Sequence, residues 1–319
     1  MLERLFPEDV RRAARAGRTF PLADFQEAAV TRARAVMRTR GGVVIADDVG
    51  LGKSYVALAL VEEALCAGQE AALIVPASLR PMWRRLLSGL EGRERVHLAT
   101  HTQLSRGSHP VGVARASLLV VDEAHAYRNP RTRRYRTLLE LCAGARVAML
   151  TATPVNNDPA DLANLVRLFA ADDAFRDVGV SSLRGLVRRQ RAGRTGSAAG
   201  EARRSAGDVR RVAQHVVVRR TWELISGADD TVRVGGKALS LPRREPPEIV
   251  TYRDPWTPAA VRLIENLELG FQGPATGPRG GASDLLRLAL LKRLDSGRAA
   301  IEVSLRRLLR LLERVRDGA

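Results

Sequence analysis

Several residue types are scarce in this sequence, and each scarcity excludes a class of protein. The 319 residues include 2 cysteines and 5 histidines, and neither type recurs at the close spacing that a structural metal site requires. Cys66 and Cys142 lie far apart within two expected helices, where a buried and reduced thiol is the usual state. We therefore expect a cytoplasmic protein without a structural metal.

Long apolar segments are also missing. No run of about 18 apolar residues occurs, so the sequence predicts no membrane span. The N-terminal stretch MLERLFPEDVRRAAR contains acidic side chains and no apolar core, so we expect no secretory signal there. The hydrophobic fraction of 45% and the charged fraction of 27% are typical of a soluble globular protein. A chain of this length forms one large domain or two modest ones.

Lysine is also scarce. It occurs only at Lys53, Lys237 and Lys292, so arginine supplies nearly all of the positive charge behind a net charge of +17. Abundant arginine and alanine are also what a GC-rich genome produces, and that explanation needs no partner. Because the imbalance is so large, the favoured interpretation is a surface that binds a polyanion such as nucleic acid. The expected location is then the cytoplasm, in association with the nucleoid.

Short apolar runs alternate with helical patterns between residues 41 and 170. The runs are continuous rather than alternating, which is typical of strands buried on both faces. The expected strands are 43–46, 71–76, 95–100, 117–125 and 145–154, and the expected helices are 53–68, 81–90, 132–144 and 158–170. This pattern predicts an α/β fold in which helices sandwich a parallel sheet, with the functional loops at the carboxyl ends of the strands.

The remaining chain differs in character. Residues 183–221 contain eleven arginines and only two acidic residues, Glu201 and Asp208. This composition predicts an Arg-rich helical excursion over about 171–214 with a small-residue tip at 192–200. These arginines either contact a phosphate backbone or form a solvated helix face. A Gly/Pro-rich stretch at 271–283 predicts a linker, and five apolar residues at helical spacing predict a helical C-terminal extension. They are Leu305, Leu308, Leu309, Leu312 and Val315.

The segment GLGKS, residues 50–54, follows an expected strand and opens an expected helix, which is the context of a phosphate loop. Gly50 and Gly52 would let the backbone curl around phosphate, Lys53 would reach the β- and γ-phosphates, and Ser54 would bind Mg²⁺. The generic pattern has glycine where this chain has Asp47. The loop alone therefore does not separate a nucleotide site from an ordinary strand-to-helix turn.

Two further motifs follow in order. LLVVDEAH places Asp122 where it can hold Mg²⁺ and Glu123 where it can orient and deprotonate an attacking water. MLTATPVNN ends the next strand with Thr151 and Thr153, whose hydroxyls we expect to hydrogen-bond the D-E-A-H turn. Each motif by itself would be a solvated loop or strand end. Together and in this order they indicate a nucleotide-hydrolysing site.

VIADDVGLGKS, VVDEAHAYRNP and MLTATPVNN, in this order, resemble the first, RecA-like P-loop lobe of SWI/SNF-type ATPases of helicase superfamily two. The resemblance implies ATP and Mg²⁺ as cofactors and a DNA-dependent ATPase that translocates along duplex DNA through backbone contacts. That family has an acid where this chain has Asp47, which removes the mismatch. The resemblance also adds Leu51 and His125 to the nucleotide site.

Similarity to the same family extends beyond the nucleotide motifs. DFQEAAV resembles the segment whose glutamine recognises adenine, which implies that role for Gln26. VVVRRT resembles a paired-arginine stretch, so Arg219 and Arg220 have either a structural or inter-lobe role or form a solvated strand end. Three other segments match as well: LIVPASLRPMW with Trp83, the short DNA-side motif HTQL, and LKRLDSGRAA, which leads toward a second lobe. Trp83, Trp222 and Trp256 are expected to be packing residues.

The family resemblance also implies a division of the chain and a missing part. We expect a helical lead-in at 1–24, the ATP-binding lobe at 25–250, and a linker with helical extension at 251–319. The family's second lobe carries a Q-x-x-G-R-x-x-R-type motif, and residues 222–319 contain nothing similar. An arginine finger of this kind is worth about 10³–10⁵ in rate. We therefore expect weak hydrolysis unless a second RecA-like lobe is supplied in trans or by a longer chain.

Two other functions compete with a translocase lobe. A non-hydrolytic module, or a truncated or split half that docks on a partner chain, would bind nucleotide and DNA without turnover. An unrelated P-loop enzyme such as a small-molecule kinase is a third possibility, but D-E-A-H and T-A-T-P together do not suit it. The sequence does not specify the biological pathway.

Overall fold

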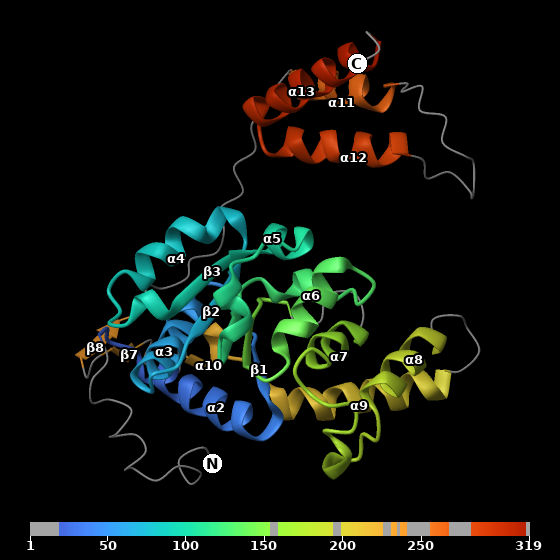
Figure 1. Cartoon of the computed structure of the whole chain (residues 1–319). Helices are drawn as coiled ribbons and strands as arrows, with labels where there is room; N and C mark the ends of the chain where they lie inside the picture. Colours follow the sequence, from blue (N-terminus) through green and yellow to red (C-terminus); the bar gives the residue numbers. More distant parts are fainter. Residues whose placement is uncertain are drawn as a thin grey trace. The chain divides into compact units, whose positions relative to one another are not determined.

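The computed structural model describes residues 19–153, 159–193, 199–225, 231–234, 237–240, 256–267 and 282–316. The chain divides into two compact units, Met1–Arg243 and Arg244–Ala319 (Figure 1). Most of the helical lead-in expected at 1–24 lies outside the described residues, and the first described helix begins at Asp24.

A six-stranded sheet forms the centre of the first unit. The strands are β1 (Gly42–Ile45), β2 (Ala71–Val75), β3 (Val96–Thr100), β4 (Leu118–Val121), β5 (Arg146–Leu150) and β6 (Val217–Val218). Their order is β3-β2-β4-β5-β1-β6, and every neighbouring pair is parallel. Strands β1, β2 and β4 are buried along their whole length, as continuous apolar runs require. The predicted parallel α/β fold is confirmed.

Helices flank both faces of the sheet (Figure 1). They are α2 (Asp24–Arg40), α3 (Lys53–Cys66), α4 (Arg80–Leu87), α5 (His101–Arg106), α6 (Arg133–Cys142) and α7 (Ala160–Val166). α2 packs on α3, β1 and β5, whereas α5 packs on α6 and β3. The four expected helices all form, each a few residues shorter than the sequence pattern indicated.

Two strands end earlier than expected, and this matters for function. β4 ends at Val121 and β5 at Leu150, so the D-E-A-H and T-A-T motifs lie in the loops that follow. Because β4, β5 and β1 are neighbours in the sheet, the loops after these three strands meet at one edge. The sheet therefore brings the three sequence motifs together.

The arginine-rich segment forms two helices, α8 (Leu183–Gly193) and α9 (Ala199–Val216). They pack on each other and on α7, and their apolar side chains join the main core: Leu183, Leu186, Val187, Val209 and Val212. The predicted helical excursion thus exists but is part of the first unit's core. The tip expected at 192–200 falls largely outside the described residues.

A small antiparallel pair, β7 (Thr231–Val234) and β8 (Lys237–Ser240), was not expected from the sequence. An isolated bridge joins Val234 to Ala23, the residue before α2. This bridge places the pair beside the start of the first described helix.

The second unit is helical, with α11 (Trp256–Glu265), α12 (Ala282–Asp295) and α13 (Arg298–Arg316). Its core consists of Ile264, Leu290, Leu294 and Ile301, with Leu305 and Leu308 packed against it. The leucine stripe of α13 is therefore only partly buried, since Leu309 and Leu312 are exposed. The helical extension forms as expected, while most of the linker at 271–283 lies outside the described residues.

The sequence predicted that both thiols are buried; this is confirmed for Cys142 and wrong for Cys66. Cys142 is buried, and burial raises the pKa of its thiol to about 12. Cys66 is exposed, because it is the last residue of α3, where the helix leaves the core. No helix in the described part of the chain is long and apolar enough to cross a membrane.

Candidate functional site

The loop between β1 and α3 has the backbone of a phosphate-binding turn. Gly50 and Gly52 adopt φ angles of 89° and 78°, a region that side chains disfavour. Gly52 also caps the N-terminus of α3, and a methyl group there would collide with the amide of Gln26. Leu51 between them is buried and fixes the loop to the core. Binding of phosphate by Gly50 and Gly52 stays a prediction.

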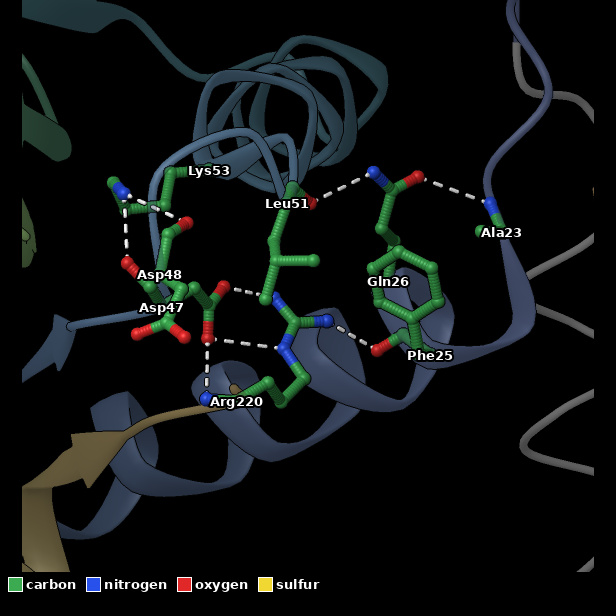
Figure 2. Close-up of polar contacts among 8 residues, drawn as sticks. All are labelled: Ala23, Phe25, Gln26, Asp47, Asp48, Leu51, Lys53 and Arg220. Atoms are coloured by element: carbon green, nitrogen blue, oxygen red, sulfur yellow. Dashed lines mark hydrogen bonds and ion pairs between the residues drawn. The ribbon is translucent and has the colours of Figure 1, made fainter. Parts of the chain in front are cut away.

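Lys53 extends over the same loop (Figure 2). Its ammonium group donates hydrogen bonds to the carbonyl oxygens of Asp47, at 2.7 Å, and Asp48, at 3.3 Å. Ser54 follows as the second residue of α3, where its hydroxyl stands at the positive end of the helix dipole. A cationic group, a helix N-terminus and Ser54 thus lie in the segment where the sequence predicted phosphate and Mg²⁺ binding.

Asp122 follows β4 and is buried. Trp83 Nε1 donates to its Oδ2 at 2.8 Å, and the Glu123 backbone N–H donates to its Oδ1 at 2.9 Å. Burial raises the pKa of the Asp122 carboxyl, while these two hydrogen bonds and the charge of Lys53 oppose the rise. A desolvated carboxylate near Lys53 is a group that a bound cation would stabilise, so the residue fits the Mg²⁺ ligand predicted for it.

Glu123 has an unusual backbone. Its φ of 49° is the one positive value among the described residues other than glycine, a conformation that costs on the order of 1–3 kcal/mol. The side chain is 43% exposed and pairs with His125 Nδ1 at 3.1 Å. The left-handed turn therefore directs a carboxylate outward from a buried strand end, where it can reach water. His125, predicted at the nucleotide site, holds this carboxylate.

Thr151 and Thr153 lie in the neighbouring loop, after β5. Thr151 is buried, and its hydroxyl accepts a hydrogen bond from the Thr153 backbone at 3.2 Å. This bond stays within the loop, so the expected hydrogen bond from Thr151 to the D-E-A-H turn is not the one formed. Residues 154–157 of the motif lie outside the described part of the chain.

Gln26 lies in the first turn of α2, beside the phosphate loop (Figure 2). Its Nε2 donates to the carbonyl of Leu51 at 3.1 Å, and its Oε1 accepts from the backbone of Ala23 at 3.0 Å. The side chain therefore connects the start of α2 to the loop. Recognition of adenine by Gln26 stays a prediction.

His101 contributes to the D-E-A-H site although sequence reasoning gave it no such role. Its Nδ1 lies 2.7 Å from the hydroxyl of Tyr127, in the short helix η5 (Ala124–Tyr127) that follows Glu123. Burial, with smaller contributions from Arg134 and His125, lowers the pKa of His101 to about 4. The HTQL segment thus supports the D-E-A-H turn with a neutral imidazole. Its position directly after β3 was the available signal.

The folded chain is expected to lose stability as the pH falls from 6.5 to 4. In this window the unfolded chain binds a proton on His101 while the folded chain does not, because the folded pKa is about 4. The contribution is at most about 3 kcal/mol. His101→Gln should remove it, which urea unfolding at pH 6.5 and 4.5 would measure. Identical pH dependence in the two proteins would contradict the assignment.

The segment after β6 lies along the phosphate loop, which the sequence did not indicate. Backbone bonds continue the β1–β6 pairing: Ala46 N to Val218 O at 2.8 Å and Asp48 N to Arg220 O at 3.0 Å. Trp222 Nε1 donates to Val49 O at 3.1 Å. The structural role favoured for the paired arginines holds for Arg220, whose guanidinium pairs with Asp47.

Arg219 and Asp48, the neighbours of Arg220 and Asp47, do not form a comparable ion pair. Arg219 is 61% exposed and lies 4.0 Å from Asp48, so the solvated alternative describes it better. Asp48 also accepts a hydrogen bond from the Trp222 backbone at 3.3 Å, a contact to which the sequence assigned nothing. Trp83 is a packing residue as expected, and in addition it holds Asp122.

Comparison with known proteins assigns part of the chain to a known domain. Residues 87–221 match the model of the SNF2-related domain. This part of the chain is a SNF2-related domain. The matched range contains the D-E-A-H and T-A-T loops and ends just after Arg220. The phosphate loop and Gln26 precede it, so their assignment rests on the motifs and geometry given above.

Individual relatives agree with the SNF2-related assignment. The chain is 28% identical over 152 residues to the ATP-dependent helicase YqhH of Bacillus subtilis, covering 42% of this chain and 27% of that protein. It is 25% identical over 152 residues to the DNA repair and recombination protein RAD54B of Homo sapiens, covering 38% and 17%. The chain therefore spans 27% of the first of these relatives and 17% of the second.

Two solved structures align with part of the chain. The SWI2/SNF2 ATPase core of Sulfolobus solfataricus in complex with double-stranded DNA aligns with a TM-score of 0.49 and 21% identity, covering 63% of this chain and 44% of that one. The same core domain without DNA aligns with a TM-score of 0.49 and 19% identity, covering 84% and 55%.

Proposed function

We propose that this chain is the ATP-binding lobe of a DNA-dependent ATPase that translocates along duplex DNA. The observation that carries the proposal is the meeting of three loops at one sheet edge, with Lys53 opening α3 after the first loop and Asp122 and Glu123 in the loop after β4. The SNF2-related domain and the ATP-dependent helicase YqhH support it.

Each residue has a defined part in the proposed reaction. The N–H groups of Gly50 to Gly52 and the Lys53 ammonium bind phosphate oxygens, and Gln26 faces the base. Ser54 and Asp122 hold Mg²⁺. When bound, ATP·Mg²⁺ supplies the phosphoryl group and most of the charge neutralisation. Glu123, exposed and oriented by His125, accepts the proton of the attacking water.

Duplex DNA is the proposed polyanion. A net charge of +17 favours a phosphate backbone as partner, and RAD54B is named for DNA repair and recombination. Exposed arginines on α8 and α9 provide candidate contacts: Arg184, Arg188 and Arg210. Contacts of this kind fix position on the duplex and read no sequence.

A second RecA-like lobe, in trans or in a longer chain, is proposed to complete the site. The relatives are several times longer than the matched part. The residues proposed here to contact the phosphates include Lys53 but no arginine. An arginine from the second lobe would supply that charge, an effect of about 10³–10⁵ in rate.

The isolated chain is therefore expected to bind ATP·Mg²⁺ but to hydrolyse it slowly. A steady-state ATPase assay with duplex DNA, combined with calorimetric ATP binding, tests this, with Lys53→Ala as the non-binding control. Turnover of about 1 s⁻¹ or more by the isolated chain would contradict the need for a second lobe. Binding without turnover even after a second lobe is added would favour the non-hydrolytic module instead.

A further inference from the structure

Arg220 lies between Asp47 and Phe25 and joins the two segments that carry them (Figure 2). Its Nε donates to Asp47 Oδ1 at 3.0 Å, and its backbone N–H donates to the same oxygen at 2.9 Å. One terminal nitrogen donates to Asp47 Oδ2, and the other donates to the carbonyl of Phe25. The guanidinium also stacks over the Phe25 ring, 5.3 Å from its centroid.

Both partners of Arg220 lie shortly before residues that are proposed to bind the nucleotide. Asp47 leads into the phosphate loop, and Phe25 precedes Gln26. Gln26 in turn donates to Leu51 O, at the far side of that loop. The contacts thus form a closed ring that runs from Arg220 through Asp47, the loop backbone, Leu51, Gln26 and Phe25 back to Arg220.

The ion pair between Asp47 and Arg220 is shielded from water. Asp47 is fully buried and the Arg220 side chain is 13% exposed, so water does not compete for their charges. The fork of the guanidinium matches the two carboxylate oxygens, which leaves one nitrogen aimed at Phe25 O. A lysine, with a single point charge, can satisfy Asp47 but not both partners in this geometry.

We propose that Arg220 is a positioning residue for the nucleotide, setting the phosphate loop and the Phe25–Gln26 segment at a fixed separation. The carboxylate of Asp47 then acts through Arg220 and not by touching the ligand. This inference rests on the proposed function, because it requires the site to bind an adenine nucleotide. It goes beyond it by assigning base selectivity to Arg220, which lies 173 positions after Asp47 in the chain.

Two variants open the ring at different contacts of Arg220. Arg220→Lys keeps a cation at Asp47 and loses the bond to Phe25 O. We expect its ATP affinity to fall about tenfold, which corresponds to the loss of one charge-assisted hydrogen bond, while GTP affinity changes little. Asp47→Asn releases Arg220 from the loop and also loosens the loop itself, so the affinities for both ATP and GTP should fall, with the larger loss for ATP. Arg219→Lys, at the exposed neighbour, is the matched control and should change neither.

The test uses the full chain with Mg²⁺ and measures ATP and GTP binding by calorimetry, with thermal unfolding of each variant alongside. A residue that only stabilised the fold would shift unfolding and leave the ratio of ATP to GTP affinity unchanged. An unchanged ratio in folded Arg220→Lys, or in folded Asp47→Asn, overturns the inference while the proposed function stands. A wild-type chain that binds no ATP overturns both.

Discussion

Glu123→Gln should reduce ATP turnover by about 10²–10⁴ in a complex of this chain with a second lobe, since general-base catalysis contributes an effect of that size. Glutamine keeps the shape of the side chain but cannot accept the water's proton. The affinity for ATP should stay close to wild type, because Glu123 lies outside the phosphate loop and pairs only with His125 among the described contacts. Steady-state turnover and calorimetric ATP binding measure the two effects separately.

Lys53→Ala provides the complementary result in the same complex. It removes the ammonium group that lies on the loop carbonyls of Asp47 and Asp48, so both binding and turnover should be lost. Glu140→Gln, an exposed glutamate on α6, is the matched control and should be silent. Wild-type turnover in either Glu123→Gln or Lys53→Ala would show that the hydrolytic site lies elsewhere.

Replacing Arg184, Arg188 and Arg210 together by glutamine should weaken DNA binding by roughly 10²–10³ at about 0.1 M salt, because each phosphate contact releases about 0.9 counterions. The slope of log K against log salt should fall by about 2.7 for the three residues. The three side chains are exposed on α8 and α9, so the fold should be retained. Fluorescence anisotropy with a labelled duplex over a salt series measures both quantities.

The control for this substitution is Arg131, Arg133 and Arg136 changed together to glutamine, since all three are exposed near α6 and carry the same charge. A larger effect from the control set would place the duplex on that surface instead. Deletion of 184–211 is not an informative alternative. Leu186, Val187 and Val209 from this segment are buried in the main core, so the deletion would destabilise the first unit itself.

Local sequence patterns were sufficient to select most of the residues of the candidate site. Gly50, Gly52, Lys53, Asp122 and Glu123 were identified because a phosphate loop and a strand-end D-E pair are contiguous in sequence. Within each motif these residues are adjacent or a few positions apart, so the motif can be recognised without information about distant segments. The sheet was predictable for a similar reason, since strands buried on both faces must be continuously apolar.

Contacts between distant segments were not predictable in this way. Trp83 was expected to be a packing residue, and its hydrogen bond to Asp122 links β4 to the helix after β2. His101 reaches the D-E-A-H turn only because α5 begins where β3 ends. Cys66 lies in an apolar helix, yet is exposed at the end of that helix. In each case the order of strands and the length of a helix decided the outcome.

The sequence by itself determined the class of fold, the three nucleotide motifs and their order. These features depend on the hydrophobic period and on residues adjacent in the chain. Only the tertiary structure decided what Asp47 and Arg220 do. β6 pairs with β1 in parallel, so Arg220 leaves its strand beside Asp47, 173 residues earlier. A buried carboxylate must find its counter-charge in space, and no local pattern specifies where that charge lies.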